Sequence, residues 1–127
     1  MEVPVAANFN DFVALSAANS PHDLIMGSGR RLELALREYY GILGPKIDSR
    51  SRGAMGKMEK AVSQDQALGP GVSSRIRELR QLRNRVAHEV IYVSCKYAAA
   101  YAQQAFGLIG ILGRRVSELE GRWGPCL

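Results

Sequence analysis

Apolar residues along most of this chain recur three and four positions apart, and few segments alternate with a period of two. This spacing is typical of amphipathic α-helices and differs from the pattern of half-buried strands. The sequence therefore predicts an all-α fold. A short first helix is expected over residues 11–18, within an N-terminal segment of residues 1–19.

The clearest helix-start signal is Ser20-Pro21-His22-Asp23. Serine suits an N-cap, proline the first helical position, and aspartate the third, where a carboxylate faces unpaired amides. The helix that follows is predicted to end near Leu43, before Gly44-Pro45. Its apolar positions keep the helical spacing: Leu24, Ile25, Leu32, Leu36, Tyr39 and Leu43.

Turn-forming residues divide the middle of the chain. The polar and basic stretch 49–56 predicts a loop, and a third helix is expected from residue 54 or 57 to residue 68. Gly69-Pro70-Gly71 is interpreted as a break between helices. A fourth helix is therefore expected to begin near residue 73 or 74 and to run to about His88.

A last long helix is predicted after the short connection 89–93, with Ser94 as its cap and an end near Glu120. Residues 121–127 are expected to form a flexible tail. Glycines recur at every third position in this helix, at a cost of about 1 kcal/mol each relative to alanine. Either another helix approaches closely there, within the chain or from a second chain, or the helix is loosely packed or kinked. These glycines are Gly107, Gly110 and Gly113, and the apolar stripe is Tyr97, Tyr101, Ala105, Leu108, Leu112 and Leu119.

Composition narrows the class of protein. The chain has 127 residues, a formal net charge of +5 and a pI of about 9.6, which fits one domain with a preference for anionic partners. Cys95 and Cys126 form neither a disulfide framework nor a zinc spacing. The start of the chain lacks the features of a signal peptide, and no apolar run reaches the length of a membrane span. We therefore expect a cytoplasmic protein with no membrane partner.

The fourth predicted helix carries the candidate chemistry. On a wheel at about 100° per residue, one side gathers the apolar residues Ile76, Leu79, Leu82 and Val86. Nearly opposite lie Arg77, Arg80, Asn84 and His88. Arg83 falls at the edge of the apolar face. A polar stripe of this kind usually meets water, so the stripe alone does not indicate a site.

The segment Leu79–Glu89 resembles the signature of HEPN domains, which has an arginine, a small polar residue, a few further residues and a histidine. Here these residues are Arg83, Asn84 and His88. The order of elements over residues 20–120 is also similar. The resemblance implies a HEPN-like domain over this range, in a chain of about five helices, paired as a two-fold homodimer whose two motifs meet in a cleft. Many HEPN proteins are metal-independent endoribonucleases, often toxins or defence effectors, whereas others are inactive binding or assembly modules.

The resemblance also implies roles for individual residues. His88 is expected to act as general acid or base, Arg83 to stabilise charge on the phosphoryl group, and Asn84 to orient its neighbours. Arg77, Arg80 and Arg85 are expected to contact the RNA backbone. Glu33 and Glu38, both on the second predicted helix, are candidate partners for Arg83 and otherwise ordinary surface ion-pair residues.

The expected partners are RNA, a second copy of the chain, and an antitoxin or larger defence complex; neither a metal nor a cofactor is expected. Two other interpretations stay open. In the first, the chain is a non-catalytic dimer that binds RNA, a nucleotide or a protein. In the second, it is a structural bundle in which Arg83 and His88 complete a hydrogen-bond network between subunits.

Overall fold

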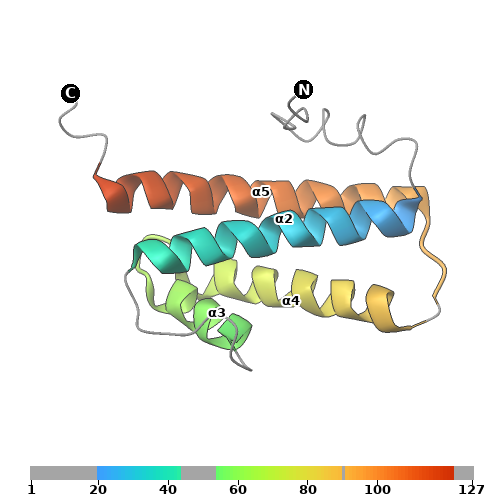
Figure 1. Ribbon diagram of the computed structural model, residues 1–127, viewed down its shortest axis with the longest axis horizontal. Helices are drawn as coiled ribbons and strands as arrows, with labels where there is room; N and C mark the ends of the chain where they lie inside the picture. The colour runs from blue at the N-terminus through green and yellow to red at the C-terminus, as the bar shows by residue number, and fades with distance from the viewer. Residues whose placement is uncertain (1–19, 44–53, 90, 122–127) are drawn as a thin grey trace.

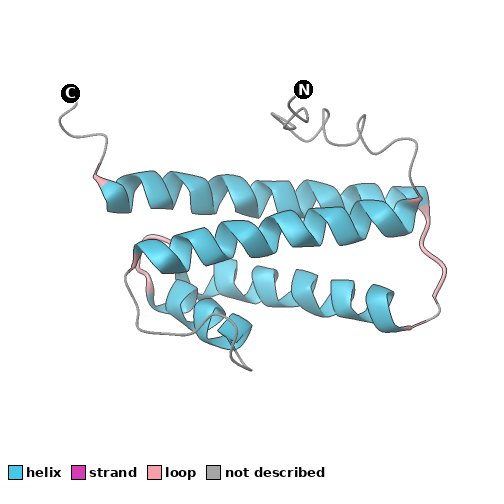
Figure 2. Cartoon of the chain, in the orientation of Figure 1, coloured by secondary structure: helices cyan, strands magenta, loops and turns pink. Residues whose placement is uncertain are grey.

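The computed structural model describes residues 20–43, 54–89 and 91–121, and this part of the chain is helical, with no strand (Figure 1, Figure 2). The all-α prediction is confirmed there. The helix expected over residues 11–18, and the tail beyond residue 121, lie outside the described residues. The helices are α2 (Pro21–Ile42), α3 (Ala54–Gln64), α4 (Gly69–His88) and α5 (Cys95–Glu120).

The three long helices lie side by side, with α2 between α4 and α5 in the view of Figure 1. The α2 and α5 helices run in the same direction, and α4 runs antiparallel to both. The short helix α3 packs on the N-terminal half of α4. As a result, the start of α2, the end of α4 and the start of α5 share one end of the bundle.

Local capping explains two of the predicted helix starts. The Ser20 hydroxyl accepts a hydrogen bond from the Asp23 amide at 3.1 Å, and Pro21 opens α2. The Ser94 hydroxyl accepts one from the Tyr97 amide at 3.0 Å, at the start of α5. Both hydroxyls satisfy amides that have no partner within their own helix.

The junction between α3 and α4 corrects the sequence prediction. Helix α3 ends at Gln64, not at residue 68, and α4 begins at Gly69, not at residue 73 or 74. The break lies over residues 65–68, where the amides of Leu68 and Gly69 both donate to the Asp65 carbonyl. Proline needs no amide partner in the first turn of a helix, so Pro70 starts α4 rather than interrupting it. Residues 54–56, included in the expected loop, are helical.

The core is formed by the facing surfaces of the three long helices, and α3 adds Met58 and Val62. The buried residues of α2 and α5 include small side chains, such as Ser28, Ala98 and Ala102, which allow the two helices to approach closely. Tyr97, predicted to belong to the apolar stripe of α5, is instead 45% exposed. The buried apolar positions of α5 are Ala98, Tyr101, Ala102, Ala105, Leu108, Leu112 and Val116.

The glycines of α5 face open space among the described residues. A Cβ atom added at Gly107, Gly110 or Gly113 would meet no heavy atom within 4 Å. The close approach considered from the sequence is therefore not made by another helix of the described chain. Approach by a second chain stays a prediction.

A polar cluster closes the end of the bundle where α2 and α5 finish. The Asp65 carboxylate accepts a hydrogen bond from the Tyr39 hydroxyl at 2.9 Å and one from the Arg115 guanidinium at 2.9 Å. Burial raises the pKa of Asp65, but the hydrogen bonds from Arg115, the Ala67 amide and Tyr39 outweigh it, so the pKa is lowered. The cluster joins α2, α5 and the turn between α3 and α4.

Candidate functional site

The two most exposed residues of the motif lie together at the end of α4. His88 is the last residue of the helix, Asn84 is one turn earlier, and both side chains are exposed. Residues four apart on a helix are neighbours on its surface. The amide and the imidazole therefore form a small polar patch at the end of the bundle where α2 begins.

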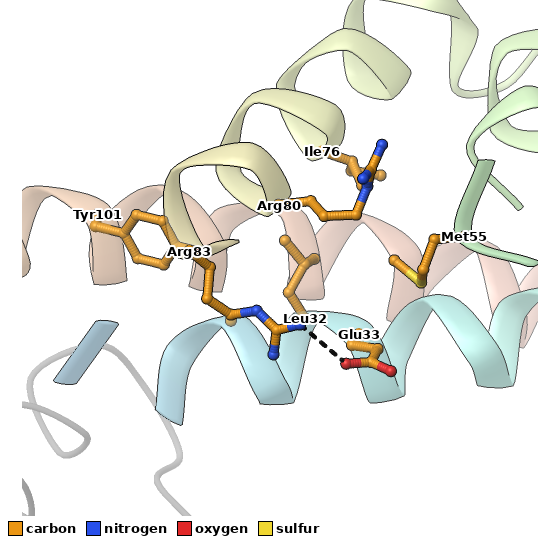
Figure 3. Close-up of a pocket in the computed structure, with 8 residues that line it drawn as sticks. Leu32, Glu33, Met55, Ile76, Arg80, Arg83 and Tyr101 are labelled. Carbon is orange, nitrogen blue, oxygen red and sulfur yellow. Dashed lines mark ion pairs between the residues drawn. The ribbon is translucent and has the colours of Figure 1, made fainter. Parts of the chain in front are cut away.

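Arg83 is directed differently, toward α2. Its side chain passes over Gly29 and beside the Tyr101 hydroxyl, and its guanidinium lies 3.6 Å from a carboxylate oxygen of Glu33 (Figure 3). The Arg83 side chain is 25% exposed and that of Glu33 is 15% exposed. The position predicted for Arg83, at the edge of the apolar face, is where the structure places it.

Glu33 holds two arginines. Arg37, one turn along α2, donates to Glu33 from two nitrogens, at 3.1 and 2.8 Å. Arg83 approaches the other carboxylate oxygen at 3.6 Å, beyond hydrogen-bond distance. The hollow beside this pair has a volume of about 10 Å³, barely enough for one water. It is lined by Gly29, Leu32, Glu33, Met55, Ile76, Arg80, Arg83 and Tyr101.

Tyr101 ties this region to α5. Its hydroxyl donates to the Leu79 carbonyl at 2.9 Å, and its side chain is buried. Burial raises the pKa of Tyr101 to about 12, although the nearby Arg83 cation acts in the opposite direction. Tyr101 is therefore a neutral donor near neutral pH and supports the stem of Arg83.

Arg80, with a side chain 28% exposed, is directed toward α3 and not to the open surface expected from the helical wheel, whereas the Arg77 side chain is 52% exposed. Helix α3 covers that side of α4, and its buried Glu59, with a side chain 3% exposed, faces both arginines. Arg80 binds Glu59 through two nitrogens, and Arg77 lies 3.6 Å from it. The hydrogen bonds that Arg80 donates to Glu59 raise the pKa of Arg80. The helical wheel predicts the direction of each side chain relative to the apolar face of α4, but it contains no information on where α3 packs.

Arg85 lies on a third side of α4. Its side chain is 59% exposed and is 3.6 Å from Glu89, whose side chain is 52% exposed. Such an exposed pair contributes about 1 kcal/mol at most. Of the three arginines expected to contact RNA, Arg85 has the most exposed side chain and only an exposed carboxylate as its partner.

His22 joins this end of the bundle, a contact that the sequence did not reveal. Its Nε2 atom donates to the Val86 carbonyl at 3.2 Å, because a carbonyl can only accept. Val86 lies in the last turn of α4, where carbonyls have no partner within the helix. His22 is exposed on the surface of α2. Its contact with α4 depends on how α2 and α4 pack.

No three His, Cys, Asp or Glu side chains within residues 20–43, 54–89 and 91–121 gather as metal ligands would. The helices of this same part of the chain are all too short or too polar to cross a bilayer. Comparison with protein-family models, with curated proteins and with solved structures finds no match for the chain. The resemblance to HEPN domains therefore stays a prediction based on the motif and on the order of the helices.

Proposed function

We propose that the chain is a HEPN-like, metal-independent endoribonuclease that acts as a two-fold homodimer, with His88 as general acid or base. The observation that carries the proposal is the exposure of Asn84 and His88 on neighbouring turns at the end of α4. Imidazole is the side-chain group that most often transfers protons in enzymes, and an exposed one is accessible to a substrate.

The proposed reaction uses the 2′-hydroxyl of the RNA. A base removes its proton, the 2′-oxygen forms a bond to the adjacent phosphorus, and the bond to the 5′-oxygen breaks. An acid protonates that leaving oxygen, which yields a 2′,3′-cyclic phosphate and a 5′-hydroxyl end. One His88 from each chain of the dimer would serve as base and as acid, which requires the two motifs to face each other.

Arg83 supports this chemistry as a positioned cation. A guanidinium has five N–H donors in a fixed plane, and the contact with Glu33 at 3.6 Å is too long to be a hydrogen bond. The donors are therefore not committed to Glu33. Arg83 would meet the charge that gathers on the phosphoryl oxygens, and Asn84 would orient His88 or bind an oxygen.

A second candidate is a non-catalytic HEPN-like dimer that binds RNA, a nucleotide or a protein. The ion pairs favour it: Arg77 and Arg80 are matched by the buried Glu59, and Arg83 by Glu33. Arg80, which donates to Glu59 from two nitrogens, stabilises the contact between helices and is less available to a substrate. A toxin or defence role, with an antitoxin or larger complex as partner, rests on the resemblance alone.

The test is cleavage of mixed RNA in excess EDTA by the wild type and by His88→Ala and His22→Ala. His22 is a matched control, because it is an exposed histidine at the same end of the bundle. The nuclease proposal expects cleavage with 2′,3′-cyclic phosphate ends by the wild type and by His22→Ala, and loss of about 100-fold or more in His88→Ala.

Two other outcomes would count against the nuclease. No cleavage by a folded wild type, combined with measurable RNA binding, supports the binding module. Equal cleavage by the wild type and His88→Ala removes His88 from the mechanism. Sedimentation of the same preparations reports whether the chain forms dimers.

A further inference from the structure

An open groove lies between α4 and α5 on the side away from Glu33 and Glu59. The two helices touch each other far less than α2 touches α5, so their facing surfaces are not closed over. The groove has a volume of about 440 Å³, within the range of small-molecule sites. It is lined by Leu82, Arg85, Val86, Ile91, Tyr92, Val93, Ser94 and Tyr97.

Two exposed tyrosines give the groove an aromatic surface. Tyr92 is 90% exposed and Tyr97 is 45% exposed, and Ile91 between α4 and α5 is 40% exposed. Among the described residues, the remaining exposed large apolar side chains, Leu34 and Leu43, belong to α2 and its C-cap. Large apolar groups gathered on one exposed surface usually mark a binding site.

Arg85 supplies positive charge at the edge of the groove. It also lines a second hollow of about 400 Å³ further along α4, together with the amides of Gln81 and Gln104. The exposed Glu89 is a weak competitor for its guanidinium. Aromatic faces, the exposed Arg85 cation and nearby amides therefore follow one another along α4.

We propose that this groove binds an unpaired nucleobase of single-stranded RNA, stacked on Tyr92 and Tyr97, with the neighbouring phosphate on Arg85. Aromatic side chains bind bases of single strands by stacking, which needs a base whose faces are free. His88 ends the helix whose last turns line the groove, so the bound base would lie close to the proposed cleavage site. This inference rests on the proposed function and gives its substrate class.

The size and charge of the surface favour a nucleotide over a second copy of the chain. A stable protein interface buries roughly 800 Å² on each partner, with 20–30 residues a side. Here the exposed apolar surface consists of Ile91, Tyr92 and Tyr97, and Arg85 is at its edge. The chain also carries a net charge of +5, which complements a phosphate backbone.

The experiment measures binding without turnover. A fluorescein-labelled 12-nucleotide RNA, fully 2′-O-methylated and therefore not cleavable at the 2′-oxygen, is titrated with the full chain and followed by anisotropy. The variants are Tyr92→Ala, Tyr97→Ala, the matching Phe variants, and Arg85→Gln. Leu34→Ala is the control, because it removes an exposed apolar side chain from another helix.

We expect each Tyr→Ala change to weaken binding of the single strand about 10-fold, because stacking on an aromatic ring is lost. The Phe variants and Leu34→Ala should stay within about twofold of the wild type, since Phe still stacks. Arg85→Gln should lower the affinity and reduce its dependence on salt. The same RNA annealed to its complement should bind more weakly than the single strand.

The inference is overturned if both Tyr→Ala variants bind the single strand as the wild type does. It is also overturned if they lose affinity only by falling from dimer to monomer in sedimentation, because the groove is then an interface between copies. Neither result depends on cleavage. Failure of this inference is therefore distinguishable from failure of the nuclease proposal, which the His88→Ala assay in EDTA decides.

Discussion

Gly29 is the point at which Arg83 crosses α2. A Cβ atom on residue 29 would collide with Cδ of Arg83 and lie 3.0 Å from the Tyr101 hydroxyl. Glycine in a helix interior costs about 1 kcal/mol relative to alanine, so its presence here has a steric reason. The absent side chain leaves the space through which the arginine reaches Glu33.

Gly29→Ala is therefore expected to destabilise the protein. The added methyl group forces the stem of Arg83 to move, which costs about 1–3 kcal/mol, and better helix propensity returns about 1 kcal/mol. We expect a net loss of up to about 2 kcal/mol in the free energy of unfolding, measured in urea. The comparison variant is Gly110→Ala, where the new methyl group meets nothing within 4 Å. That change should stabilise by up to about 1 kcal/mol, and equal effects at both positions would refute the steric explanation.

Asp65 should make the stability depend on pH in the acid range. Its pKa in the folded protein is below the ordinary value of about 3.9, so the folded state favours the charged carboxylate. The stabilisation is fully present above that ordinary value and is lost as pH falls through the folded pKa. Asp65→Asn should cost about 1–2 kcal/mol at pH 7, and the gap to the wild type should shrink below about pH 4. Urea unfolding at pH values from 7 to 2.5 measures the difference in unfolding free energy between the wild type and Asp65→Asn. A difference that does not change with pH would contradict the lowered pKa of Asp65.

The sequence predicted the helix class, the caps and most helix ends because these depend on residues close together in the chain. Ser20 and Ser94 cap their helices through amides three residues away. The start of α4 was missed because Gly69-Pro70 is compatible both with a break and with a first helical turn. The turn at Asp65 decides between the break and the helical start, and the Asp65 carboxylate is held by Tyr39 and Arg115 from other helices.

The candidate site was less predictable because its partners come from elsewhere in the chain. The sequence leaves Glu33 and Glu38 open as partners of Arg83, and nothing in the pattern shows that Gly29 gives Arg83 the space to reach Glu33. The helical wheel described α4 relative to its own apolar face, so the cover provided by Glu59 of α3 was invisible. Tyr97 fits the spacing of a core residue, yet it is exposed and lines the groove between α4 and α5.

Glu59 is expected to be the main polar contact between α3 and α4. Glu59→Gln keeps the shape of the side chain but leaves Arg80 and Arg77 without a carboxylate. Removing one partner of a buried ion pair is costly, and because both arginines are partly exposed we expect a loss of about 2 kcal/mol in unfolding free energy. The control is Glu89→Gln, which breaks an exposed pair with Arg85 and should change stability by less than about 0.5 kcal/mol. Similar losses in the two variants would show that α3 is not held through Glu59.

The two histidines are expected to differ in what they do for stability. His22 donates to the Val86 carbonyl and so satisfies a group at the open end of α4, whereas His88 is an exposed last residue of that helix. His22→Ala should lower the unfolding free energy by about 1 kcal/mol, and His88→Ala should change it by less than about 0.5 kcal/mol. Hydrogen exchange of the last turn of α4 should increase in His22→Ala, because its carbonyls lose a cap. If His88→Ala proved the more destabilising variant, His88 would have a structural role, and a loss of RNA cleavage in that variant would no longer identify it as the acid or base.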